Sequence, residues 1–235
     1  MTAGKHTIHV GSYNVHKAVG TDRRRKPERI AAVIAEMAVD ILALQEVDTR
    51  FGERKGILDL AGVESELGLM AARSRVFGLA HGFHGNLLLV RNAEVQDVHY
   101  LPLPGLEPRG ALIADLVIGK VPMRVVSAHL GLIAASRRAQ VRTILDKLSL
   151  LDKRPALLMG DLNERRVGGG SSLRGLAEHF PNAPTVPSFP SRYPLFRLDR
   201  IMASSNVAVS ELAAHDTPLA RSASDHLPIR ARLEV

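Results

Sequence analysis

The chain is short of several residue types, and each shortage excludes a class of protein. It has no cysteine, so disulfides and cysteine-ligated zinc are excluded. It has no tryptophan, six phenylalanines and three tyrosines, which is poor equipment for stacking on single-stranded bases. No segment approaches the roughly 18 apolar residues needed to span a bilayer, and the first residues lack the apolar region of a signal peptide. We therefore expect a cytoplasmic protein.

The bulk composition indicates one folded domain. At 235 residues with 46% hydrophobic residues, the chain can bury a sizeable core, and we expect residues 1–235 to form a single domain. The formal net charge is +7, and part of it lies in the run Arg23–Lys26. Two interpretations of that run stay open: a solvated loop before a helix, or attraction to a polyanion such as nucleic acid or an anionic membrane.

The hydrophobic pattern predicts more strands than helices. Apolar residues recur at helical spacing over residues 26–40 and 134–151, and less regularly over 171–180. Short strand-like runs occupy residues 6–15, 40–47, 86–92, 111–118, 123–130, 156–163, 197–204, 207–215 and 227–235. Because many strands are not followed by a helix, a repeated βαβ barrel is disfavoured. The pattern indicates mixed sheets packed together, with helices outside.

Five of these apolar runs end or begin at polar side chains suited to phosphate chemistry. The side chains are Asn14, Gln45-Glu46, His129, Asp161 with Asn163, and the pair Asp225-His226. One such residue is ordinary, because turns favour Asp and Asn. Five together would supply oxygen ligands for a hard ion such as Mg²⁺ and two imidazoles for proton transfer. A metal ion and two imidazoles together can promote hydrolysis of a phosphate ester by a positioned water.

The motifs around these residues resemble a known family. In chain order they are NVHK, LQEVD, SAHLG, GDLN, LDRI and SDHLP, and they resemble the endonuclease/exonuclease/phosphatase superfamily, with its DNase I-like fold. The resemblance extends from Asn14 to His226. It implies a four-layered α/β sandwich, in which two mixed β-sheets pack face to face with helices outside. The absence of cysteine departs from the secreted DNase I-like enzymes, which carry disulfides.

The resemblance also assigns metal-side residues. Glu46 matches the main metal-binding glutamate, Asn14 the asparagine beside that metal, and Asp225 a further carboxylate on the metal side. The metal implied is Mg²⁺, with Mn²⁺ as a substitute. The plain alternatives are a solvent-facing strand end for Glu46 and a capping residue for Asn14.

A second set of matches implies the reaction machinery. Asp161 and Asn163 match the pair that orients the attacking water and contacts the phosphate, the alternative being an Asx-turn. His226 matches the histidine nearest the scissile phosphate, and Asp199 the carboxylate that sets its tautomer. His129 matches the histidine on the leaving-group side, where it would donate a hydrogen bond or a proton; its partner is not evident from the sequence.

Candidate substrate-binding residues are less sharply indicated. Arg109 in EPRGAL matches an arginine near the substrate phosphate, and Asn86 lies in a GNLLL run similar to a family motif. Arg137 and Gln140 follow SAHLG at helical spacing and either face the cleft or form an exposed helix face. The element Ser188–Pro190 resembles part of a substrate loop.

These matches predict a Mg²⁺-dependent phosphodiesterase with nucleic acid or a phospholipid as substrate. One alternative is a phosphomonoesterase acting on a small phosphorylated metabolite, and another is a catalytically silent binding module on the same fold. The segments 49–84 and 164–197 are the places for substrate selectivity. An anionic membrane surface is a further candidate partner, to which the protein would bind peripherally; no obligate protein partner is indicated.

Overall fold

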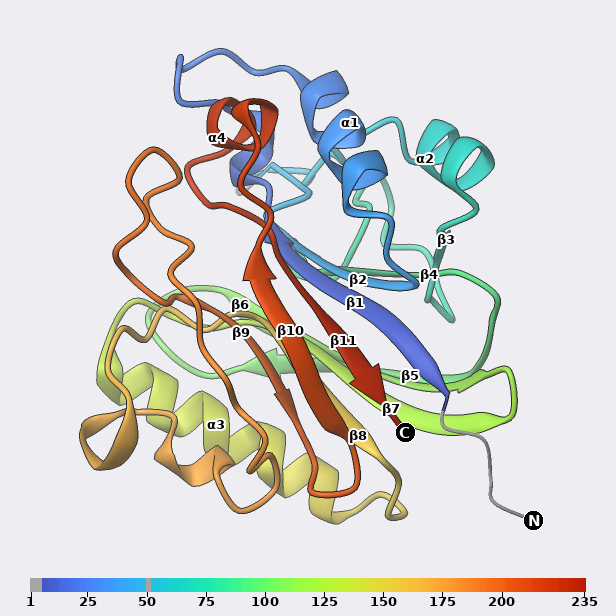
Figure 1. Ribbon diagram of the computed structural model, residues 1–235, viewed down its shortest axis with the longest axis vertical. Helices are drawn as coiled ribbons and strands as arrows, with labels where there is room; N and C mark the ends of the chain where they lie inside the picture. The colour runs from blue at the N-terminus through green and yellow to red at the C-terminus, as the bar shows by residue number, and fades with distance from the viewer. Residues whose placement is uncertain (1–5, 50–51) are drawn as a thin grey trace.

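The structure, a computed structural model, describes residues 6–49 and 52–235. Two mixed β-sheets pack face to face, with helices on both outer faces (Figure 1). The first sheet has the strand order β10-β11-β1-β2-β4-β3 and the second β5-β6-β7-β8-β9. This is the four-layered sandwich that the sequence predicted.

The elements have the following bounds. The strands are β1 (Thr7–Asn14), β2 (Ile41–Gln45), β3 (Met70–Ala71), β4 (Leu87–Val90), β5 (Ala93–Leu103), β6 (Arg109–Ile118), β7 (Val121–His129), β8 (Ala156–Asp161), β9 (Asp199–Ala203), β10 (Ala208–Ala214) and β11 (Ile229–Glu234). The helices are α1 (Pro27–Met37), α2 (Leu60–Leu67), α3 (Ala134–Ser149) and α4 (Pro218–Ala223). No helix within the described residues is long and apolar enough to cross a membrane.

Three apolar clusters hold the layers together. The cluster between the sheets takes alternate residues of both sheets, such as Val10 in β1 and Met159 in β8. A second cluster packs α1, α2 and α4 on the first sheet, and a third packs α3 on the second. Because side chains alternate along a strand, each strand supplies one face to the central core and the other to a helix layer.

One expected helix is replaced by a shorter element. Residues 171–180 were predicted as helix, but only the 3₁₀ turn η3 (Arg174–Leu176) forms there. Gly175 lies at its centre against α3, where an added Cβ would meet Val141 at 3.3 Å. A glycine both weakens a helix and permits this close approach, so the segment packs as a turn with Leu176 and Phe180 buried.

Strand alternation and register bring the predicted polar residues to one end of the sandwich. In β8 the side chains of Leu157 and Met159 belong to the central core, so Asp161, two residues further, lies on the same face at the strand's end. Asp161 is in register with His129 of β7 on one side and with Asp199 of β9 on the other. Three strands therefore place three candidate residues side by side, at the spacing of neighbouring strands.

Candidate active site

The Asp161 carboxylate is the centre of the buried polar cluster. Its Oδ2 accepts a hydrogen bond from Asn14 Nδ2 at 2.9 Å, and it lies 3.4 Å from His129 Nε2 and 3.8 Å from His226 Nε2. Its Oδ1 accepts from the backbone N–H of Asn163 at 3.0 Å. The first sheet contributes Asn14, the second His129 and Asp161, and His226 lies just before β11. The cluster therefore spans both sheets at one end of the sandwich.

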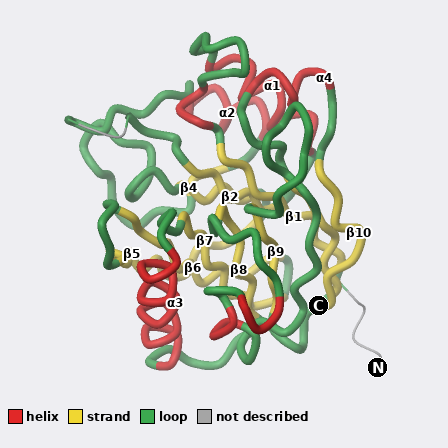
Figure 2. The backbone as a smooth tube through the Cα atoms, turned by 90° about the vertical axis from the view of Figure 1, so that its left-hand side faces the viewer, coloured by secondary structure: helices red, strands yellow, loops and turns green. Residues whose placement is uncertain are grey.

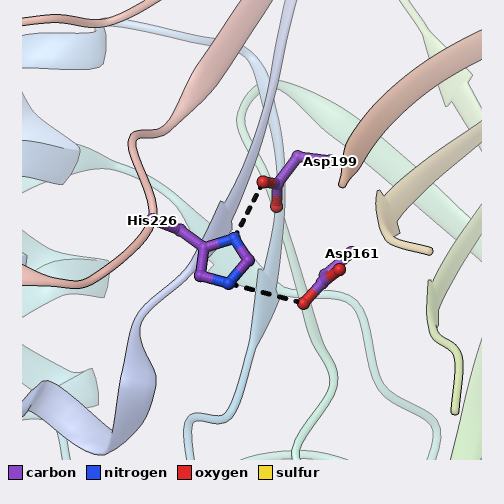
Figure 3. Close-up of side chains that lie close together, drawn as sticks. All are labelled: Asp161, Asp199 and His226. Carbon is purple, nitrogen blue, oxygen red and sulfur yellow. Dashed lines mark hydrogen bonds and ion pairs between the residues drawn. The ribbon is translucent and has the colours of Figure 1, made fainter. Parts of the chain in front are cut away.

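His226 is held between two carboxylates (Figure 3). Its Nδ1 lies 2.9 Å from Asp199 Oδ2, while its Nε2 faces Asp161. Although burial opposes the charged imidazolium, Asp199 and Asp161 raise the pKa of His226 to about 10. The Phe189 ring packs on the imidazole with a centroid distance of 4.8 Å. His226 is therefore a buried, oriented imidazolium whose Nε2–H points into the cluster.

Ser188 supports this pair from behind. Its Oγ–H donates to Asp199 Oδ2 at 2.5 Å, and the other oxygen, Oδ1, is buried without a hydrogen-bond partner within the described residues. The loop carrying Ser188 and Phe189 resembled a substrate-loop element in sequence. In the structure it contacts the Asp199–His226 pair directly.

We expect Ser188→Ala to lower the free energy of unfolding by about 1–3 kcal/mol, because a buried carboxylate loses a donor. Urea denaturation followed by far-UV circular dichroism measures this, since the chain has no tryptophan. The matched control is Ser149→Ala, whose exposed hydroxyl donates only to the Asp146 carbonyl. Equal stability of the two variants would show that Ser188 does not support Asp199.

His129 has a partner that the sequence did not reveal. Arg109 Nη1 donates to His129 Nδ1 at 2.9 Å, and Glu107 Oε2 holds the same guanidinium at 2.7 Å from Nη2. Because arginine only donates, Nδ1 must be the unprotonated nitrogen and the ring proton sits on Nε2, toward Asp161. Burial and then the Arg109 charge lower the pKa of His129 to about 4. His129 is thus a neutral Nε2–H donor.

Glu46 lies beside this group. Its carboxylate forms an ion pair with Lys17 Nζ. Burial alone would raise the pKa of Glu46, but Lys17 and the His129 imidazolium, which forms below pH about 4, lower it to about 2. Glu46 has a backbone φ of 59°, in the left-handed region that non-glycine residues rarely adopt. Such backbone strain is concentrated at functional sites.

The residues predicted to hold a metal have suitable chemistry. Glu46 lines a cavity of about 30 Å³ with Lys17, Arg109 and His129, whereas Asn14 and Asp225 do not line it. The positively charged Lys17 ammonium already lies against the ionised Glu46 carboxylate. Asp225 Oδ1 lies 3.6 Å from His16 Nδ1, and Asn14 Oδ1 accepts from the His16 backbone. Oxygen donors of this kind suit a hard divalent cation.

Among the described residues, the carboxylates and histidines whose ligand atoms lie within 4.8 Å of one another are instead Asp161, Asp199 and His226, a group that does not include Glu46 or Asp225. In this group, however, Asp199 receives hydrogen bonds from Ser188 and His226. A nitrogen that donates to a carboxylate has no lone pair for a metal. The arrangement therefore favours an oriented imidazole over a metal site.

Three sequence candidates for substrate contact are buried in structural hydrogen bonds. Asn86 Nδ2 donates to the carbonyls of Phe83 and Gly110. Arg137 donates to Ser172, Glu164 and the carbonyls of Gly131 and Leu132. Gln140 donates to the Pro104 carbonyl and accepts from the Gly131 N–H. All three are at most 6% exposed. The structure thus shows these three side chains bonded within the protein, whereas the fourth candidate, Arg109, contacts the cluster through His129.

Sequence reasoning missed three residues of this site: Glu107, Lys17 and, in its contact with Asp199, Ser188. Lys17 stands in NVHK and Glu107 two residues before Arg109, so each lay within or beside a motif. The Lys17–Glu46 contact joins segments distant in sequence, whereas Glu107 and its partner Arg109 are two residues apart. The run Arg23–Arg25 is exposed on the loop before α1.

Comparisons with known proteins give a family match and structures of the same fold. The Endonuclease/Exonuclease/phosphatase family model matches residues 11–226. The YbhP protein of Escherichia coli K12 is 35% identical over 167 residues, which cover 66% of this chain and 64% of YbhP. The chain thus matches less than two thirds of that relative's length.

Two solved structures share the fold. The Bacteroides thetaiotaomicron mannosyl-6-phosphatase Bt3783 has a TM-score of 0.70 at 16% identity, covering 96% of this chain and 99% of that one. TDP2 of D. rerio, complexed with a single-strand DNA product, has a TM-score of 0.69 at 15% identity, covering 97% and 99%. At such identities the likeness establishes the fold. With the family model matching nearly the whole chain, the protein belongs to the endonuclease/exonuclease/phosphatase family.

Proposed function

We propose that this protein is a metal-dependent phosphoesterase that hydrolyses phosphodiester bonds by in-line attack of water. The observation that carries the proposal is the buried cluster in which Asp161 faces both His129 Nε2 and His226 Nε2. An acceptor for a water proton thus lies beside two donors for phosphoryl oxygens. A protein that only binds has no need of the Asp199 carboxylate behind His226.

We assign the metal to Glu46, Asp225 and Asn14, and we propose Mg²⁺, with Mn²⁺ as a substitute. Oxygen ligands and the ionised state of Glu46 support this assignment. When bound, the cation would neutralise charge on the phosphoryl oxygens. Lys17 would then give up its ion pair with Glu46.

The remaining residues act on water and phosphate. Asp161 orients the attacking water and accepts its proton, while its own position is held by Asn14 and the Asn163 backbone. The His226 imidazolium stabilises the negative charge that develops on phosphorus-bound oxygens, and Asp199 keeps its ring oriented. His129, neutral with its proton on Nε2, contributes a hydrogen bond on the leaving-group side and keeps that proton.

The preference for a diester rests on the family resemblance, in which His129 of SAHLG matches the second histidine of the phosphodiesterase branches. There its Nε2–H would stabilise the negative charge that develops on the departing oxygen. The phosphomonoesterase remains the second candidate, because the mannosyl-6-phosphatase shares the fold. Nucleic acid as substrate has the parallel of TDP2 with its DNA product. We propose the cytoplasm, or a membrane surface facing it, as the location.

The test is initial-rate hydrolysis of bis(p-nitrophenyl) phosphate beside p-nitrophenyl phosphate, with Mg²⁺ or Mn²⁺ and with EDTA. We expect diester cleavage that EDTA abolishes. Glu46→Gln should require at least about tenfold more Mg²⁺ for half-maximal rate, because the ligand loses its charge. Glu66→Gln, at an exposed position on α2, is the matched control.

Two outcomes would contradict the proposal. Cleavage of the monoester alone would move the phosphomonoesterase to first place. An Mg²⁺ titration that Glu46→Gln leaves unchanged would place the ion elsewhere.

A further inference from the structure

Four loops frame the cluster, and each is joined directly to one of its residues. We call them the rim loops: 104–108 precedes Arg109, 130–133 follows His129, 164–172 follows Asn163, and 188–198 precedes Asp199. They gather at the end of the sandwich where β7 and β8 finish and β6 and β9 begin. In Figure 2 this end, on the left of Figure 1, faces the viewer.

Polar contacts, several of them buried, join the rim loops to one another. Gln140 links the Pro104 carbonyl to the Gly131 N–H, and Glu107 Oε1 accepts from Leu132 N–H at 3.1 Å. The Arg137 guanidinium then links residues 131–132 to Glu164 and Ser172.

Arg200 completes the frame, since its guanidinium donates to the carbonyls of Glu164 and Arg197. Because buried donors and acceptors that lose a partner are costly, these contacts hold the four loops as one surface.

This surface exposes apolar side chains in an unusual concentration. Seven of the eleven exposed large apolar residues in the described part of the chain lie on the rim loops. They are Leu106, Leu132, Ile133, Val167, Tyr193, Leu195 and Phe196. Leu106 is 83% exposed and Leu195 67%. Single exposed leucines are ordinary, but a group of them around one site indicates a surface that binds something apolar.

The same loops carry positive charge that no acidic side chain balances. Arg165, Arg166, Arg192 and Arg197 are exposed, and none forms an ion pair within residues 6–49 and 52–235. The Arg165 guanidinium lies 5.6 Å from the centre of the Phe196 ring. The acidic residues of the rim loops, Glu107 and Glu164, are instead paired inward with Arg109 and Arg137.

We propose that the rim loops dock on the surface of an anionic phospholipid bilayer, with the active site facing the lipid headgroups. This rests on the proposed phosphodiesterase function and narrows its substrate to a headgroup phosphodiester. Leucine and aromatic side chains insert at the membrane interface, while arginines near an anionic surface strengthen binding about fivefold each. Two signals together are what stable peripheral binding requires.

Nucleic acid fits this surface less well. Phosphate contacts would use the arginines, but a nucleic-acid backbone offers nothing to exposed leucines, isoleucine and valine. An anionic bilayer binds both apolar and positively charged side chains, so it explains why the rim loops expose both.

The test is co-sedimentation of the full chain with vesicles in EDTA, so that binding is measured without turnover. One set contains phosphatidylcholine alone and the other equal parts phosphatidylcholine and phosphatidylglycerol. We expect binding to the mixed vesicles that weakens as salt is raised. The double variant Leu106→Asp/Leu195→Asp should bind at least about tenfold more weakly. Leu150→Asp is the matched control, since Leu150 is 80% exposed beyond the far end of α3.

Three results would overturn the proposal: no sedimentation of the wild type with mixed vesicles, equal loss in the Leu150→Asp control, or unchanged binding by the double variant. Binding to a DNA duplex that survives the leucine substitutions, without vesicle binding, would assign the arginines to nucleic acid. A dimer that the double variant dissociates, again without vesicle binding, would assign the surface to a second copy of the chain. Hydrolysis of the soluble diester is measured separately, so failure of the proposed function is distinguishable from failure of membrane docking.

Discussion

Replacing His226 by alanine is expected to lower turnover of bis(p-nitrophenyl) phosphate by about 10²–10⁴-fold, the range for loss of a positioned proton-transfer or charge-stabilising group. The physical reason is the pair of carboxylates around it. Asp199 and Asp161 raise the pKa of His226 to about 10, although burial opposes this. The ring therefore brings a positive charge to an otherwise acidic cluster. Alanine supplies neither that charge nor the Nε2–H directed at Asp161.

The stability of this variant must be measured beside its rate. Removing the imidazole leaves Asp199 as a buried carboxylate whose remaining side-chain donor is Ser188, and breaking a buried pair costs about 3–5 kcal/mol. The double variant Asp199→Asn/His226→Ala removes both charges and should recover part of that loss without recovering turnover. His179→Ala, at an exposed histidine, is the control. Turnover near the wild-type rate in a folded His226→Ala protein would refute the assignment.

Asp161→Asn is the second substitution with a large expected effect, a loss of about 10²–10³-fold in kcat. The carboxylate accepts from Asn14 and faces the Nε2 atoms of both histidines. An amide has nearly the same shape but only one accepting oxygen, so its NH₂ group must face a donor. It also cannot take a proton from water. Both effects act at the point where the reacting water is expected.

Asp146→Asn, at an exposed position of α3, is the control for this change. Equal kcat for Asp161→Asn and the wild type would show that the water is activated elsewhere. A rise in KM with kcat unchanged would make Asp161 a binding residue only.

The helices with regularly spaced apolar residues were predicted from the sequence, whereas the two short helices were not. α1 and α3 formed within the predicted ranges, because their apolar residues lie on one face. α2 and α4 were missed, although Asp59 and Thr217 cap them and Pro218 begins α4. Both have eight residues or fewer, too short for periodicity to be read. The strand β5 was missed because it mixes polar and apolar residues and its alternation is interrupted by a register shift between Val95 and Asp97.

For the site, the sequence by itself determined which residues gather at one end. Four strands, β1, β7, β8 and β9, pack alternate side chains into the core between the sheets. The same alternation puts Asn14, His129, Asp161 and Asp199 on that face, at one end of each strand. This is a local rule, since side chains two residues apart share a face. The chemistry of the motifs then indicated phosphate esters and a hard metal ion.

Only the tertiary structure decided the partners of these residues. The hydrogen bond between Arg109 and His129 joins residues 20 apart in the chain, and the one between Ser188 and Asp199 joins residues 11 apart. Neither contact is indicated by the local sequence pattern. Arg137 and Gln140 have a sequence spacing equally suited to a cleft or to an exposed helix face. In the structure both side chains are buried and form hydrogen bonds with the loops. A sequence pattern specifies the face of an element. Which side chains meet across that face depends on how separate elements pack, and this is settled only when the layers are assembled.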